Sequence, residues 1–166
     1  PIAPTIGALS VSAKNYGDAS FNLTAPTSNS SGVFVYSSSN SEVASVTTGG
    51  IVTIIGAGTT TITATQEASI DGNYTTGSVT ASLVVSPVAP TIGALSAPAK
   101  NYGDASFNLT NPTSNSNGAF NYSSSAASVA TVTSGGLVTI VGAGTTTITA
   151  EQAATTNYTT GSVTAS

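Results

Sequence analysis

The sequence predicts an all-β fold of two β-sandwiches in tandem, and two observations carry this prediction. First, residues 1–64 align with residues 87–150 without a gap, and 50 of these 64 positions are identical. Second, short runs rich in Val, Ile, Thr, Phe and Tyr alternate with Gly, Asn and Asp, as in strands joined by tight turns. No stretch has apolar residues at helical spacing over three turns. Seven short strands in a repeat of about 80 residues are the pattern of a β-sandwich.

The repeat also predicts the domain organisation. After an offset of two residues, positions 73–82 recur letter for letter as positions 157–166. We therefore expect a first domain at residues 1–86 and a second at residues 87–166, each near the lower size limit for a self-sufficient core. Sequence repeats of a fixed length are typical of tandem arrays, in which each repeat is one structural unit and the number of repeats determines the total length.

Turn signals separate the expected strands of the first repeat. They are Tyr16-Gly17-Asp18, residues 29–32, Gly49-Gly50 and Gly56-Ala57-Gly58, and each offers residues that favour turns. Gly56-Ala57-Gly58 has neither the spacing nor the lysine of a nucleotide loop, so it is interpreted as a strand-to-strand connection. The sequence between the turns predicts strands at residues 5–10, 19–24, 33–38, 43–47, 51–55, 59–66 and 78–85.

Differences between the repeats indicate which side chains face the core. Phe34 and Tyr36 recur in the second repeat, whereas Val35 between them becomes Asn121. Because alternate residues of a strand face opposite sides, Phe34 and Tyr36 should point inward and position 35 outward. The same rule predicts that the last strand buries Val79, Ala81, Leu83 and Val85.

Two further comparisons concern the strand at 51–55 and the loop before it. Ile51 becomes Leu137 and Ile55 becomes Val141, which are changes of volume that a core tolerates, so we expect both positions to be buried. Residues 40–42 differ at all three positions and should form an exposed loop. The junction after Val85 contains Pro87 and Pro90, and proline favours an extended, semi-rigid link.

The last strand differs between the repeats. Leu83-Val84-Val85-Ser86 continues the first repeat beyond Ser82, whereas Ser166 is the matching position of the second. The second sandwich is therefore expected to have a truncated last strand within this sequence. Two interpretations stay open: a tail lies outside the sequence, or a neighbouring subunit supplies the missing pairing.

Composition excludes several partners. Lys14 and Lys100 are the two basic residues, against six acidic ones, and the formal net charge is −4. Such a chain lacks the basic patches that bind nucleic acid or an anionic membrane. It contains no Cys and no His, and it has no run of 18 apolar residues, so we expect no membrane insertion in this segment. A tandem array rich in Ser, Thr and Asn favours an extracellular location.

The motifs of the first repeat resemble bacterial immunoglobulin-like (Big-type) domains of surface and secreted proteins. The resemblance lies in Val43-Ala44-Ser45-Val46, Gly49-Gly50 and the block from Gly56 to Ala64, followed by Asn73-Tyr74. It covers both copies nearly end to end. It implies immunoglobulin-like Greek-key sandwiches in tandem, and it carries no catalytic residues over to this chain.

The residue types that enzyme sites require are missing, so we expect no catalytic and no cofactor-binding residues. A nucleophilic Ser needs a neighbouring base, and His is absent. Lys14 recurs once per repeat at the same place, which favours a structural or surface role. An isopeptide crosslink of Lys14 is the less favoured alternative to a solvated loop in which Asp18 caps its own turn.

Calcium and carbohydrate are the remaining candidate ligands. Glu67, Asp71 and Asn73 could offer oxygen ligands, but the second repeat replaces Glu67 with Ala153 and lacks Asp71, so a turn is favoured and no metal site is expected. Four tyrosines in loops could stack on sugars or anchor loops to the sandwich, and anchoring is favoured. These are Tyr16, Tyr74, Tyr102 and Tyr158.

The sequence thus predicts a structural repeat module of an extracellular bacterial stalk, fibre or filament. Self-association with like modules or subunits is the expected partnership, because low charge weakens mutual repulsion. The alternative is an adhesion module, as in an adhesin, that binds a glycan or surface receptor through its end loops. A spacer should tolerate changes at residues 29–32 and 71–74, whereas a binding module should lose affinity.

Overall fold

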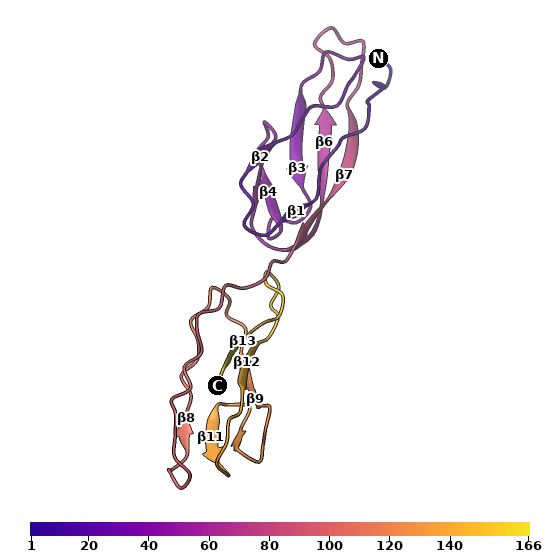
Figure 1. Cartoon of the computed structure of the whole chain (residues 1–166). Helices are drawn as coiled ribbons and strands as arrows, with labels where there is room; N and C mark the ends of the chain where they lie inside the picture. The colour runs from indigo at the N-terminus through magenta and orange to yellow at the C-terminus, as the bar shows by residue number, and fades with distance from the viewer. The chain divides into compact units, whose positions relative to one another are not determined.

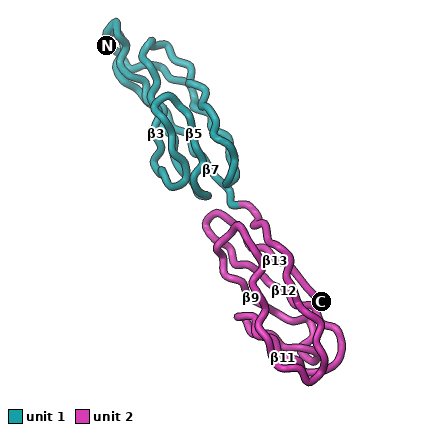
Figure 2. Tube along the Cα trace, turned by 90° about the vertical axis from the view of Figure 1, so that its left-hand side faces the viewer, with its two compact units in different colours: residues 1–87 teal, residues 88–166 magenta.

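The chain folds into two compact units built of β-strands and turns. The structure, a computed structural model, describes all residues from 1 to 166 and contains no helix. Unit 1 comprises Pro1–Pro87 and unit 2 comprises Val88–Ser166 (Figure 2). The prediction of an all-β fold is confirmed.

Unit 1 is a sandwich of a four-stranded and a three-stranded sheet (Figure 1). The larger sheet has the order β1 (Lys14–Asn15), β7 (Gly77–Ser86), β6 (Gly58–Gln66) and β3 (Phe34–Ser38). The smaller sheet has the order β2 (Phe21–Asn22), β5 (Ile51–Ile54) and β4 (Ala44–Val46). The chain crosses between the sheets after β1, β2, β3 and β5, whereas β4 pairs with β5 and β6 with β7 within one sheet.

The two long strands form the centre of unit 1. β6 and β7 pair antiparallel over nine positions, from Gly58 opposite Val85 to Gln66 opposite Gly77. β1 pairs parallel with the last part of β7, with Lys14 opposite Val85 and Asn15 opposite Ser86. The beginning and the end of the unit are therefore joined directly in one sheet.

Unit 2 repeats this plan, but each of its two sheets has three strands. Its two three-stranded sheets have the orders β13-β12-β9 and β10-β11-β8. The strands are β8 (Phe107–Asn108), β9 (Phe120–Ser124), β10 (Ala130–Val132), β11 (Leu137–Ile140), β12 (Ile148–Gln152) and β13 (Gly161–Ala165). Residues 100–101, which match β1, lie outside the strands.

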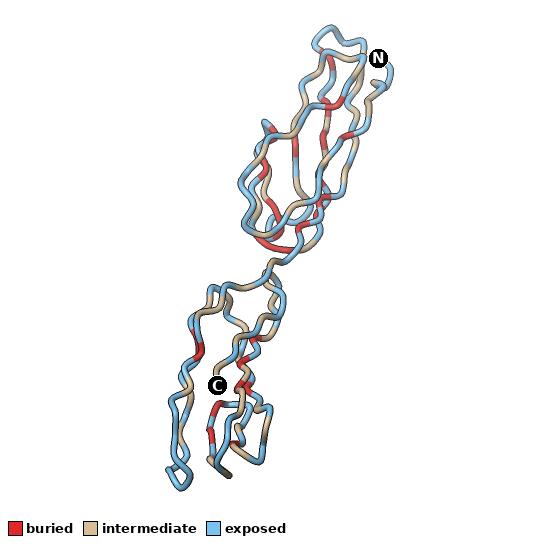
Figure 3. The backbone as a smooth tube through the Cα atoms, in the orientation of Figure 1, coloured by how far each residue is buried: buried red, intermediate tan, exposed pale blue.

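The cores follow the predicted alternation. In β7 the side chains of Val79, Ala81, Leu83 and Val85 pack in the core of unit 1, and the residues between them are exposed. Phe34 and Tyr36 pack there too, as predicted. Buried positions (red in Figure 3) occur in both units. Residues 40–42 are exposed, which confirms the predicted loop.

Two sequence expectations are wrong. Residues 5–10 form no strand, because Gly7 pairs with Thr27 in an irregular loop, where the Asn29 side chain accepts the Thr5 N–H in place of a backbone carbonyl. The strand β1 lies instead at Lys14–Asn15, where a loop was expected.

Ile51 and Ile55 are also not core residues. They are 48% and 47% exposed, as are their counterparts in unit 2 at 39% and 46%. The core-facing residues of β5 are Val52, which is fully buried, and Ile54, which packs against the same core. Because strand residues alternate, Ile51 next to Val52 must point outward, and conservative volume changes alone did not reveal this.

Candidate functional site

A cavity of about 520 Å³ opens into the core of unit 2. Apolar side chains from both sheets form its floor, and the segments 97–102 and 142–146 form its two rims. Ser166 also lines it. The floor includes Phe107, Leu109, Val138, Ile140 and Ile148.

The same space in unit 1 is filled by the second half of β7. Leu83 and Val85 are 0% and 2% exposed there, and they belong to one cluster with Ile62 and Val52. Ile62 and Val52 are the counterparts of Ile148 and Val138, which line the cavity of unit 2. The cavity therefore lies at the place where residues 83–86 of β7 pack in unit 1.

Both edges beside the cavity lack their partner strand. In unit 1, Gly58, Thr59 and Thr60 pair with Val85, Val84 and Leu83. In unit 2 the matching residues 144–146 lie outside any strand, and β12 begins only at Ile148.

Exposure changes accordingly around the cavity. Val43 is 6% and Ala57 8% exposed in unit 1. Their counterparts differ, since Val129 is only half-buried and Ala143 is exposed. Tyr102 is 74% exposed, whereas its counterpart Tyr16 packs against the core of unit 1. Unit 2 thus presents apolar surface that unit 1 covers.

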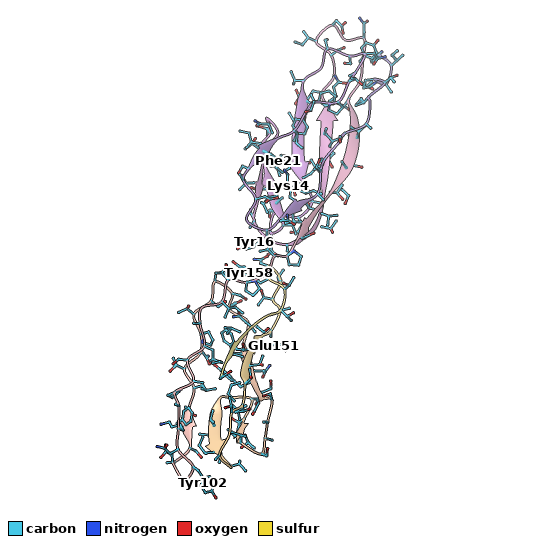
Figure 4. All side chains as sticks on the ribbon, in the orientation of Figure 1. Lys14, Tyr16, Phe21, Tyr102, Glu151 and Tyr158 are labelled. Atoms are coloured by element: carbon cyan, nitrogen blue, oxygen red, sulfur yellow. The ribbon has the colours of Figure 1, made fainter.

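The lysine of each repeat has a structural contact. Nζ of Lys14 lies 4.7 Å from the centre of the Phe21 ring (Figure 4). The same atom of Lys100 lies 5.0 Å from the centre of the Phe107 ring. These contacts are cation–π interactions, and the one in unit 1 joins β1 to β2, which lie in different sheets. The Asp18 carboxylate accepts the backbone N–H of Asn15 at 2.8 Å, which confirms the predicted turn cap.

The residues considered for calcium form a self-contained turn. The Asp71 carboxylate accepts the Ser69 hydroxyl, and at 3.0 and 2.8 Å it accepts the backbone and side-chain N–H groups of Asn73. These hydrogen bonds, led by that of Ser69, hold the pKa of Asp71 below its usual value. Hydrogen bonds within the turn therefore occupy the oxygens that a cation would need.

Three of the four loop tyrosines are half-buried. Tyr74 bridges to Ile2, and Tyr158 bridges to Val88 in the same way. Tyr16 packs against the core of unit 1. Tyr102 is the exception, because it is largely exposed. The sequence-based preference for anchoring is therefore confirmed for Tyr16, whereas Tyr74 and Tyr158 are held through backbone bridges.

The sequence did not reveal a buried glutamine in each unit. Gln66 and its counterpart Gln152 are each 1% exposed. Oε1 of Gln66 accepts the Ser28 hydroxyl at 2.6 Å, and Nε2 donates to the carbonyls of Ser30 and Gly32 at 3.1 and 2.7 Å. Gln152 makes the matching three bonds. The one available signal was a glutamine at the same place in both repeats.

The family model of the intimin immunoglobulin-like domain matches residues 24–69 and 108–155, which together exceed half of the chain. The chain belongs to the intimin immunoglobulin-like domain family. This confirms the resemblance to bacterial immunoglobulin-like domains that the motifs indicated. In both units of this intimin-type chain the match includes the central strands from β3 to β6 and from β9 to β12. The match supports an extracellular structural or adhesion-type module.

Three solved structures match nearly the whole chain at low sequence identity and with TM-scores below 0.5. Drosophila N-cadherin EC1-4 is 13% identical with a TM-score of 0.43, and the match covers 98% of this chain and 48% of that one. Surface layer protein SbsC, domains 1–6, is 20% identical with a TM-score of 0.33, over 98% and 27%. A SusE-like surface located polysaccharide binding protein of Bacteroides thetaiotaomicron is 13% identical with a TM-score of 0.36, over 97% and 33%.

The intimin-type chain thus spans less than half the length of these structures. A search of the curated proteins finds no significant match. The structure has no helix of sufficient length and apolar character to cross a membrane.

Proposed function

We propose that this chain is a structural repeat module of an extracellular bacterial stalk, fibre or filament, and that it performs no catalysis. Membership of the intimin immunoglobulin-like domain family supports the extracellular location. The observation that carries the proposal is the parallel pairing of β1 with the end of β7 in unit 1. This pairing gives the unit a means to resist tension along its length.

The direction of the two strands decides how they respond to a pull. Ile2 is held at one end of unit 1 by Asn73 and Thr75, and β1 lies at the other end beside Val85 and Ser86 (Figure 1). A pull on the two ends of the unit slides β1 and β7 past each other. The hydrogen bonds between them, including that from Tyr16 N to Ser86 O at 2.9 Å, are then loaded together rather than one after another.

The two repeats also agree in their structural contacts. The buried glutamine, the turn cap and the cation–π pair occur in both units. In contrast, the Asp71 turn is specific to unit 1. The contacts that recur in both units therefore stabilise the fold, as expected for a module that acts as a structural spacer. We propose like modules or subunits as its partners.

An adhesion module that binds a glycan or receptor is the second candidate function. Ile70 supports it, because this large apolar residue lies at a loop tip of unit 1 and is fully exposed. Tyr102 offers a similar surface in unit 2. Exposed apolar residues at loop tips are the positions through which an adhesive domain would contact a partner.

Binding of beads coated with the chain to glycan arrays and host-cell surfaces separates the two functions. A structural module predicts no saturable binding, and Ile70→Ser and Tyr102→Ser leave the signal at the level of uncoated beads. Saturable binding that either substitution abolishes would replace the structural proposal with the adhesive one. Val84→Thr, at an exposed mid-strand site, is the matched control.

A further inference from the structure

Unit 2 contains a dipeptide that unit 1 lacks, Asn117-Gly118. It is the one place in the chain where Asn precedes Gly, and the matching residues of unit 1 are Ser31 and Gly32. An asparagine followed by glycine can react with its own backbone, because glycine has no side chain that keeps its nitrogen away from the asparagine amide carbon. The sequence difference thus gives unit 2 a reactive position that unit 1 does not have.

The fold requires the glycine of this pair. A Cβ at Gly118 would lie 2.0 Å from the carbonyl oxygen of Ala153. The next residue, Ala119, fixes this close approach, since its carbonyl accepts the Ala153 N–H at 2.9 Å. Only glycine fits so near to the end of β12. Whether the site can react therefore depends on the residue before the glycine, which is Asn in unit 2 and Ser in unit 1.

Asn117 is placed to react, unlike Asn115 in the same loop. Oδ1 of Asn115 accepts the backbone N–H of Thr91 at 2.8 Å, and this bond fixes the side chain. Asn117 is exposed and its side chain makes no such bond, so its amide carbon can turn toward the following nitrogen. The N–H of Gly118 donates to the Ser116 hydroxyl at 3.2 Å, at the long end of the usual range. Little therefore opposes contact between the two reacting atoms.

We propose that Asn117 deamidates without an enzyme and that the product loosens the loop held by Gln152. Hydroxide removes the amide proton of Gly118, and the nitrogen attacks Cγ of Asn117. A five-membered succinimide closes, and the side-chain nitrogen leaves as ammonia with a proton taken from water. Water then cleaves the ring at Cγ to give aspartate, or at the backbone carbonyl to give isoaspartate. The net reaction consumes one water, releases one ammonia and leaves a carboxyl group.

Isoaspartate is the product with a structural consequence. Its backbone runs through Cβ and Cγ, so the chain between residues 116 and 118 gains one atom. Nε2 of Gln152 donates to the carbonyls of Ser116 and Gly118 at 3.0 and 2.8 Å, which requires a fixed spacing between these carbonyls. The longer backbone changes the spacing and breaks one of the two bonds, which leaves a buried polar group unsatisfied. A reaction at an exposed side chain thus weakens the interior of unit 2, whether the module spans or adheres.

Ageing of the full 166-residue chain in oxygen-18 water at mildly alkaline pH tests the reaction. Mass spectrometry with peptide mapping should find labelled oxygen at residue 117, in both aspartate and isoaspartate, before any appears at Asn115. Asn115 is the matched control, because it lies in the same loop but its side chain is held. Absence of label at residue 117, or labelling of Asn115 at the same rate, would overturn the proposal.

Chromatographic separation of the aged forms tests the structural consequence. In the isoaspartate form the nuclear magnetic resonance signals of the Gln152 side-chain amide should shift. The Tm of unit 2 should fall by at least about 4 °C, since loss of one net hydrogen bond has this effect in a domain of this size. The Tm of unit 1 should not change. An isoaspartate form that keeps both the Gln152 signals and the Tm of unit 2 would contradict the proposal.

Two variants separate the longer backbone from other effects of ageing. Freshly prepared Asn117→Asp has the new charge with the normal backbone, so it should keep the Gln152 signals. Asn117→Ser gives unit 2 the residue of unit 1, and ageing should leave its Tm unchanged. Loss of the Gln152 signals in fresh Asn117→Asp would show that charge rather than backbone length loosens the loop, which would overturn the mechanism proposed.

Discussion

The side-chain amide of Gln66 donates to the backbone carbonyl of Gly32 at 2.7 Å, and Gln152 makes the same bond to Gly118 at 2.8 Å. Each glutamine lies at the end of a central strand and holds the loop that leads into β3 or β9. A buried amide with all its groups bonded fixes a loop firmly, because releasing the loop would expose unpaired polar groups to an apolar environment.

Replacing Gln66 should therefore destabilise unit 1 selectively. Gln66→Leu removes the acceptor of the Ser28 hydroxyl and the donor to two carbonyls, and each unsatisfied buried group costs about 1–3 kcal/mol. We expect the free energy of unfolding of unit 1 to fall by about 2–5 kcal/mol. Residue-resolved denaturant unfolding measures this, with unit 2 as an internal control. A loss of equal size from Glu67→Gln, at the exposed neighbouring residue, would contradict the role given to Gln66.

Gly32 should resist substitution for a steric reason. A Cβ at this position would lie 1.9 Å from the carbonyl oxygen of Glu67, so the loop would have to move away from β6. We expect Gly32→Ala to lower the free energy of unfolding by about 1–3 kcal/mol. Gly49→Ala is the matched control, because its Cβ would meet nothing closer than 4.0 Å. Equal midpoints for the two variants in thermal unfolding would refute the steric argument.

A third prediction concerns the buried half of β7. Leu83 is fully buried, so Leu83→Ala should cost about 2–5 kcal/mol of unfolding free energy. The neighbouring Val84 is 44% exposed, and Val84→Ala should change stability by less than about 0.5 kcal/mol. Denaturant unfolding of both variants checks the alternation of this strand. A larger effect at Val84 would mean that β7 is turned the other way.

Protonation of Asp71 should weaken its turn at low pH. Hydrogen bonds from Ser69 and Asn73 lower its pKa in the folded state, so the unfolded chain binds a proton more readily between that value and about 3.9. The turn's contribution is therefore complete above about pH 4 and is lost as the pH falls through the folded-state pKa. A carbon-13 titration of the carboxyl group measures the pKa directly, and Ser69→Ala should raise it toward the usual value. An Asp71 pKa at or above the usual value would contradict the bonding described.

Sequence patterns predicted the strands whose side chains alternate. Val79 to Val85, and Phe34 with Tyr36, show a period of two, which the core of a sandwich enforces. The expectation that Ile51 is buried was wrong because conservative volume changes also occur on exposed faces. Ile51 points outward because it is next to the buried Val52 in the strand.

The remaining features depend on contacts between segments far apart in sequence. The strand β1 exists because residues 14–15 meet the end of β7 some 70 residues later, and no local signal marks that pairing. Gln66 is likewise recognisable only with its partners at 28–32 in view.

Single-molecule force spectroscopy of the chain, pulled from its two ends, tests the tension-bearing role most directly. The account predicts two unfolding steps, each releasing about 26–29 nm of chain, with unit 1 the stronger because only unit 1 pairs β1 with β7. Leu83→Ala should lower the force of the stronger step alone. Unfolding without resolved force peaks, or a stronger step that Leu83→Ala leaves unchanged, would contradict a structural module that carries load through β1 and β7.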